Sequence, residues 1–172
     1  MKIGIPKEIH AGEKRVATTP EVAKQLIKLG FEVAIEAGAG AAAHYSDASY
    51  VEAGVTVIKN AQEVWTDSDI ILKVCVPEMH PELKKEEIDL LHENQILITF
   101  LWPAQNPEML KKLAEKKVTA LAMDMIPRIS RAQKLDALSS MANIAGYRAV
   151  VEAAQHFGRF FTGQITAAGK VP

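Results

Sequence analysis

The sequence has little cysteine and no long apolar run. Its one cysteine, Cys75, excludes an internal disulfide framework and fits a reducing compartment. No apolar stretch approaches the roughly 20 residues that span a bilayer, and the chain begins with a short apolar strand rather than a signal peptide. We therefore expect a soluble chain in which Cys75 is a buried core thiol, rather than a catalytic or redox group.

The sequence also lacks an excess of either charge. The chain has 20 Lys and Arg residues and 21 Asp and Glu residues. No basic patch therefore indicates a nucleic-acid partner. No two histidines have ligand spacing on one helix face, which predicts no metal site; they are His10, His44, His80, His92 and His156. Ser139 and Ser140 are not flanked by a G-x-S-x-G turn, so no nucleophile elbow is predicted.

Apolar strand-like segments alternate with helical segments along most of the chain. Strands are predicted at residues 2–6, 31–37, 55–58, 69–76, 95–101 and 118–123. Helices are predicted from Thr19 to Gly30, at 47–53, from Asn60, at 81–92 and at 107–116. This alternation predicts an α/β fold of three layers, an open, mostly parallel sheet with helices on both faces, flavodoxin-like or Rossmann-like.

The pattern changes after Asp136. Residues 137–157 form an Ala-rich stretch that predicts one long helix. We therefore expect an α/β domain at 1–136 and a connecting helix and linker at 137–172, and the last residues resemble a linker inside a longer protein.

Two patterns could bind an anion or a dinucleotide, and each also has a plain interpretation. Residues 38–43, G-A-G-A-A-A, match G-x-G-x-x-A after a strand, but His44 follows at once and no acidic residue ends the next strand, which favours a plain glycine-rich loop. Arg15 and Lys73 lie near strand ends, where they could bind a carboxylate or phosphate. The alternative is a surface Arg and a Lys whose stem snorkels.

The strongest candidate site lies in the run P-R-I-S-R-A-Q-K-L-D-A-L-S-S from residue 127 to 140. Polar donors and acceptors gather there just before a helix, at Arg128, Gln133, Asp136 and Ser139. Such a loop suits a planar polar group such as an amide or a ribose. The alternative is a solvated helix N-terminus with Asp136 as its N-cap.

The whole chain resembles the alanine dehydrogenase and transhydrogenase family. Shared segments are IGIPKE at 3–8, RVATTP at 15–20 and ILKV at 71–74; WPAQNP at 102–107, the run beginning at Pro127 and FGRFFTGQITAAGKVP at 157–172 look like the transhydrogenase branch. The branch is the α subunit, the NAD(H)-binding component, of proton-translocating nicotinamide nucleotide transhydrogenase. The resemblance implies that the family's Rossmann domain for NAD(H) is not in this chain.

The resemblance also implies roles for single residues. Arg128, Asp136 and Ser139 would bind the nicotinamide end of NAD(H), and Gln133, the expected catalytic residue, would reach toward NADP(H). Tyr147 would pack or gate nearby. Alanine dehydrogenases have a catalytic His where this chain has Trp102, and an indole cannot accept the proton that oxidative deamination releases.

The implied activity is hydride transfer from NADH to NADP⁺ coupled to proton translocation, with this fragment inactive alone and no metal involved. Implied partners are the β subunit with its NADP(H)-binding component, the membrane-spanning component and a second copy in a homodimer. The implied location is peripheral, on the cytoplasmic side of the inner (plasma) membrane. The alternatives are an alanine dehydrogenase-like oxidoreductase and a non-catalytic dimerisation module.

Overall fold

The computed structural model describes residues 1–171. The chain divides into two compact units, Met1–Met125 and a second that begins at Ile126. This division falls before Asp136, the end of the first domain predicted from the sequence. Each unit is described separately.

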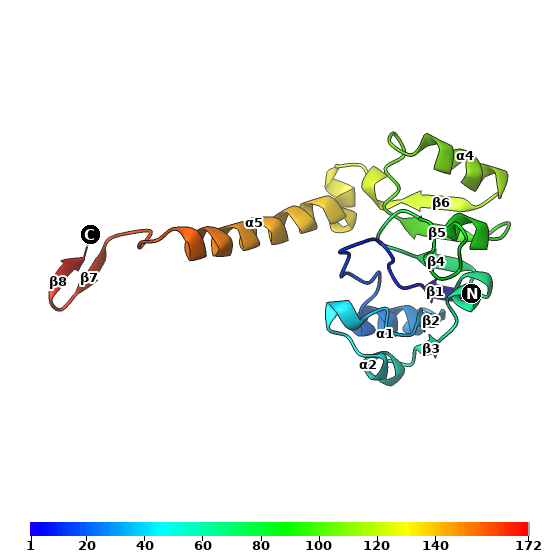
Figure 1. Cartoon of the computed structure of the whole chain (residues 1–172), viewed down its shortest axis with the longest axis horizontal. Helices are drawn as coiled ribbons and strands as arrows, with labels where there is room; N and C mark the ends of the chain where they lie inside the picture. The colour runs from blue at the N-terminus through cyan, green and yellow to red at the C-terminus, as the bar shows by residue number, and fades with distance from the viewer. Residues whose placement is uncertain (172) are drawn as a thin grey trace. The chain divides into compact units, whose positions relative to one another are not determined.

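A single parallel sheet organises the first unit. Its strands lie side by side in the order β3-β2-β1-β4-β5-β6 (Figure 1), and every neighbouring pair is parallel. They are β1 (Lys2–Ile5), β2 (Glu32–Glu36), β3 (Thr56–Ile58), β4 (Ile70–Leu72), β5 (Ile96–Thr99) and β6 (Thr119–Ala122). The predicted α/β class is confirmed, and the strand order is that of the Rossmann fold, which reverses direction between β1 and β4.

Four α-helices connect these strands: α1 (Pro20–Lys28), α2 (Asp47–Glu52), α3 (Ala61–Thr66) and α4 (Pro107–Glu115). The first three begin at side chains that accept a backbone N–H, and these caps are Thr19, Ser46 and Asn60. Such caps satisfy donors that a helix start leaves free. The predicted starts of these helices, at Thr19, Asp47 and Asn60, agree with the structure to within one residue.

Alternating side chains on the strands build a core on each face of the sheet. On one face Ile5 and Ile35 pack with Ala23 of α1 and Tyr50 of α2. On the other face Ile71 and Leu97 pack with Trp65 of α3 and Leu113 of α4. Gly4 faces α3 so closely that an added Cβ would lie 2.7 Å from the carbonyl oxygen of Val64. The sheet is thus covered by helices on both faces, as a parallel sheet requires.

One predicted strand is too long, and one predicted helix is wrong. The strand predicted at 69–76 ends at Leu72, because the N–H groups of Val74 and Cys75 donate to the Glu8 carboxylate instead of continuing the ladder. The helix predicted at 81–92 is only a 3₁₀ helix, η2 (Glu87–Leu90). Met79 pairs with Glu86 in an antiparallel bridge, so the chain folds back where the helix was expected.

The second unit contains a 3₁₀ helix, η4 (Ser130–Leu135), the long helix α5 (Ala137–His156) and a hairpin of β7 (Gln164–Thr166) and β8 (Gly169–Val171). The long helix predicted at 137–157 is therefore confirmed, whereas the hairpin was not expected. No helix within residues 1–171 has the length and apolar character needed to cross a membrane.

Candidate functional site

The four residues predicted from the polar run come together in one pocket of the second unit. This pocket has a volume of about 480 Å³, and its lining is Arg128, Ile129, Ser130, Gln133, Asp136 and Ser139. Pockets of about 300–1,000 Å³ are the usual size for small molecules and cofactors. The candidate site is therefore large enough for a planar ring with its substituent.

Asp136 caps α5 with its carboxylate. Its Oδ1 accepts the backbone N–H of Ser139 at 3.0 Å, and its Oδ2 accepts the Ser139 hydroxyl at 2.6 Å. These hydrogen bonds from Ser139, helped by the charge of Arg128, lower the pKa of Asp136. Asp136 is thus a fixed, ionised acceptor, and Ser139 keeps free lone pairs on its hydroxyl oxygen.

Arg128 and Gln133 line the same pocket. Both residues are exposed, and neither side chain has a hydrogen bond or ion pair to any group within residues 1–171. Gln133 lies in η4, which turns its side chain into the same pocket as Asp136. The guanidinium and the carboxamide are therefore available to a ligand.

The chemistry of this pocket is that of binding and orientation. Arg128 supplies only donors, Asp136 supplies only acceptors, and Gln133 supplies both. This set matches a planar amide, whose oxygen accepts and whose NH₂ donates. An ionised carboxylate held by a cap is a poor general acid near neutral pH, so the pocket suits chemistry carried by a bound group.

Lys73 lies in a buried ion cluster at the carboxyl end of β4. Its side chain is 0% exposed, and its Nζ lies 3.2 Å from Glu8 and 3.0 Å from Glu87, whose side chains are 3% and 0% exposed. Burial raises the pKa of Glu87, although the charge of Lys73 opposes the rise. The ammonium of Lys73 is thus paired with carboxylates of the chain itself. It neither extends to solvent nor faces a free anion site.

Arg15 is also paired within the chain. Its Nε and Nη2 donate to the Glu13 carboxylate at 2.8 and 2.6 Å, and these bonds lower the pKa of Glu13 to about 2. The Glu13 carboxylate also accepts the Cys75 thiol at 3.3 Å. Burial, together with that carboxylate, raises the pKa of Cys75 to about 12. Cys75 is half-buried and lies outside β4, so its predicted place in the core is wrong.

The glycine-rich segment at 38–43 is a loop. The N–H of Gly38 donates to Asp47, and the three-residue 3₁₀ helix η1 (Ala41–Ala43) ends at His44. The segment follows β2, whereas the dinucleotide fingerprint belongs after the first strand. A neighbouring pocket of about 200 Å³ is smaller than the usual small-molecule site.

Trp102 lies in a turn that two polar side chains hold. Asp124 accepts the N–H groups of Leu101 and Trp102 at 2.7 and 3.0 Å, and Asn106 donates to both carbonyl oxygens. Trp102 has a φ of 49° and is 44% exposed. A left-handed backbone conformation is strained for tryptophan. These four hydrogen bonds stabilise it just beyond the carboxyl end of β5.

Comparison with known proteins relates the whole chain to one family. A family model described as "Alanine dehydrogenase/PNT, N-terminal domain" matches residues 4–145. The NAD(P) transhydrogenase subunit alpha of Cereibacter sphaeroides is 58% identical over all of this chain and 32% of that protein, and that of Haemophilus influenzae is 55% identical over the same shares. A transhydrogenase structure from Sinorhizobium meliloti superposes with a TM-score of 0.87 at 38% identity, covering 100% of this chain and 49% of that one. The chain spans about a third of the length of these two curated relatives.

Proposed function

From the chain's membership of the alanine dehydrogenase/PNT N-terminal domain family, we propose that it is the first part of the NAD(H)-binding component of a proton-translocating NAD(P) transhydrogenase. The parent protein then transfers hydride from NADH to NADP⁺ and couples this to proton translocation. The observation that carries the proposal is the pocket that joins Arg128, Gln133, Asp136 and Ser139. We assign to it the nicotinamide end of NAD(H).

The donors and acceptors of this pocket fit a nicotinamide carboxamide. Arg128 donates to the carboxamide oxygen, and the free lone pairs of Asp136 and Ser139 accept from its NH₂ or from the ribose hydroxyls. The capping bonds from Ser139 fix the orientation of Asp136 before any ligand binds, which lowers the entropy lost on binding. The pocket offers no glycine-rich phosphate loop, so the pyrophosphate needs another domain of the parent protein.

When bound, the nicotinamide supplies the hydride chemistry, and the protein contributes alignment. The side-chain amide of Gln133, in η4, makes no hydrogen bond to any group within residues 1–171. We place this amide between the nicotinamide of NAD(H) and that of NADP(H), which a partner component presents. The absence of a basic side chain at position 102 fits this reaction, because ring-to-ring hydride transfer needs no proton acceptor, whereas oxidative deamination does.

The proposed partners are the NADP(H)-binding and membrane-spanning components of the transhydrogenase, at the cytoplasmic side of the inner membrane. We also propose a homodimer. Helix α5 supports further assembly, since Ile144, Tyr147 and Val150 are 57%, 74% and 64% exposed along it. Several exposed apolar side chains on one helix usually mark a surface that binds another chain or domain.

The test is a Gln133→Asn substitution in the full-length protein. Shortening the side chain by one methylene leaves the amide but moves it, so we expect the hydride-transfer rate to fall on the order of tenfold to a hundredfold while the Kd for NADH stays near the wild-type value. Lys134→Gln is the matched control, because Lys134 neighbours Gln133 and does not line the pocket. Equal losses in rate and NADH affinity would refute the role of Gln133 in aligning the two nicotinamides.

A further inference from the structure

Helices lie on both faces of the sheet, but the two faces differ in burial where β4, β5 and β6 form it. On one face Ile71 and Leu97 are 0% exposed. On the other face the apolar side chains of the same three strands contact solvent, since Leu121 is 50% exposed and three others are only partly buried. We call this set the open face, and its members are Leu72, Ile96, Ile98 and Leu121.

The open face is a continuous apolar surface. Its first row across the three strands, set by the registers of β4 with β5 and of β5 with β6, is Leu72, Ile98 and Leu121. The row two residues earlier along the strands, on the same face, is Ile70, Ile96 and Thr119. Neither row contains a charged side chain. Such a surface is unusual in water, because parallel sheets are normally covered on both faces.

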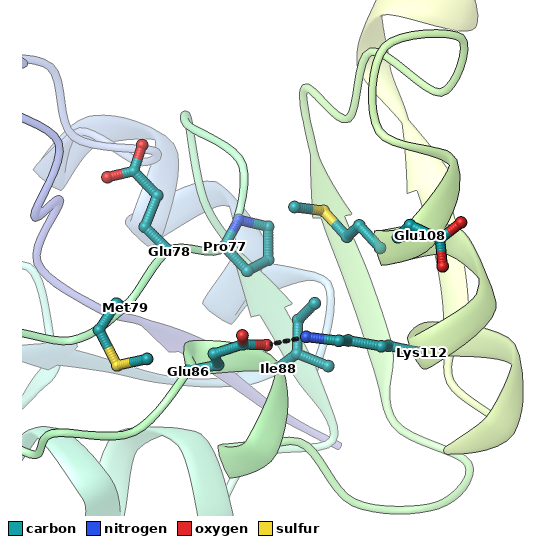
Figure 2. Close-up of a pocket in the computed structure, with 8 residues that line it drawn as sticks. Pro77, Glu78, Met79, Glu86, Ile88, Glu108 and Lys112 are labelled. Atoms are coloured by element: carbon teal, nitrogen blue, oxygen red, sulfur yellow. Dashed lines mark hydrogen bonds and ion pairs between the residues drawn. The ribbon is translucent and has the colours of Figure 1, made fainter.

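The covered face of these strands shows what a covering layer does. There η2 and α4 lie over the sheet, and Ile88 and Leu113 are 3% and 2% exposed. Lys112 of α4 reaches to Glu86, just before η2, and ties the two segments together (Figure 2). On the opposite face α1 packs against β2 and α2 against β3, so these helices cover the other half of the sheet.

The strand order explains why the open face lacks a helix of its own. From β1 to β3 the sheet grows in one direction, and from β4 to β6 it grows in the other. Crossovers between parallel strands are right-handed, so connections that run in opposite directions lie on opposite faces. Helices α1 and α2 accordingly lie on one face, and α3 and α4, which lead to β4 and β6, lie on the other. A cover for the open face must therefore come from outside residues 1–125.

We propose that a helix from the part of the parent protein that follows residue 172 covers the open face. The inference rests on the proposed function only in taking this chain as the first part of a longer component. The chain spans 32% of the length of two relatives, so most of such a component lies outside it. A segment of the same polypeptide meets the face at a far higher effective concentration than a separate protein does.

The dimensions of the open face fit one helix. Three strands about 4.8 Å apart make a surface about 10 Å wide, which matches the diameter of an α-helix with its side chains. The covering helix presents apolar side chains at i, i+3 or i+4, and i+7, because that spacing forms one stripe.

Thiol labelling compares the 172-residue chain with the full-length protein. In the 172-residue chain we expect Leu121→Cys to react with a maleimide about as fast as Leu29→Cys, a control position that is 74% exposed and outside the open face. In the full-length protein we expect the reaction at position 121 to slow on the order of tenfold or more, since it then requires local opening. The rate at position 29 stays the same. Peptide mapping by mass spectrometry assigns each label to its cysteine.

Photo-cross-linking identifies the covering segment. With p-benzoylphenylalanine in place of Leu121 in the full-length protein, we expect a cross-link to one segment beyond residue 172 of the same chain. The sample is a mixture of ¹⁴N-labelled and ¹⁵N-labelled protein, in which a cross-link within one chain joins peptides of a single isotope.

An unchanged labelling rate at position 121 in the full-length protein overturns the proposal. So does a cross-link to residues 126–172, to a peptide of the other isotope, which marks a second copy, or to a different protein. Failure of the proposed function is a separate result. A full-length protein that protects position 121 but transfers no hydride between NADH and NADP⁺ refutes that function and leaves this inference standing.

Discussion

Substituting Lys73 by Met tests the buried ion cluster at the carboxyl edge of the sheet. Methionine keeps most of the side-chain length and removes the ammonium, so Glu8 and Glu87 lose the cation that bonds to both. The three side chains are 0%, 3% and 0% exposed, so water cannot take the place of the lost partner. Removing one member of a buried pair costs about 3–5 kcal/mol, and we expect the free energy of unfolding to fall by that amount at pH 8.

The loss should depend on pH in a direction that burial sets. In the wild type, burial already raises the pKa of Glu87 while Lys73 opposes the rise, so Lys73→Met raises this pKa further. A carboxyl with a raised folded pKa adds stability below its unfolded pKa, about 4.3, and loses it as the pH rises through the folded value. The difference between variant and wild type should therefore be smaller at pH 5 than at pH 8.

Urea unfolding at pH 5 and at pH 8, followed by circular dichroism, measures the loss of stability and its dependence on pH. Lys111→Met is the matched control, because Lys111 pairs with Glu108 where the two side chains are 67% and 77% exposed, and we expect a change below about 1 kcal/mol. A loss below about 1 kcal/mol for Lys73→Met, or a loss that does not change between pH 5 and 8, would refute the reasoning.

Three further predictions follow from packing and charge. Cys75, with a pKa of about 12, should react with a disulfide reagent at pH 8 far more slowly than free cysteine, and a free-thiol rate would contradict this. Gly4→Ala should lower the free energy of unfolding by about 1–3 kcal/mol, because its Cβ would lie 2.3 Å from Ser68 Oγ and 2.7 Å from Val64 O. Gly146→Ala in α5 is the control, since its Cβ would meet no atom within 4 Å and should cost nothing. Equal effects of the two substitutions on urea unfolding would refute this. Glu13→Gln should reduce stability near pH 6 by less than about 1 kcal/mol, since the Arg15 side chain is 46% exposed. That difference should vanish as the pH falls from about 4.3 through the lowered pKa of about 2, and its persistence in acid would count against the pair.

Much of the fold followed from local patterns. Thr19 before Pro20 and Asn60 before Ala61 are short signals that depend only on neighbours, and each caps the helix it precedes. Asp136 capping α5 belongs to the same class. The polar run around it could be identified as a site because its members lie close together along the chain, so one turn and one helix start suffice to bring them together.

The buried ion cluster contacts both segments where the predictions differ from the structure. Residues 69–76 and 81–92 have suitable composition for a strand and a helix, but Glu8 accepts the N–H groups of Val74 and Cys75, and Glu87 turns inward to Lys73 and to the N–H of Glu78. Glu8 lies 65 residues from Lys73 along the chain, and nothing in a local window indicates that they meet. A long-range ion cluster outweighed local propensity, because an unpaired buried charge costs several kcal/mol and propensity differences are well below that.

The sequence by itself determined the alternation of strands and helices, the caps and the grouping of Arg128, Gln133, Asp136 and Ser139, since all of these depend on spacing within a few residues. Only the tertiary structure decided which carboxylates neutralise Lys73 and how Asp124 holds Trp102 in a left-handed turn. Those contacts arise where parallel strands end at one edge of the sheet, and the order in which strands pair is set by the packing of the whole domain rather than by any one segment.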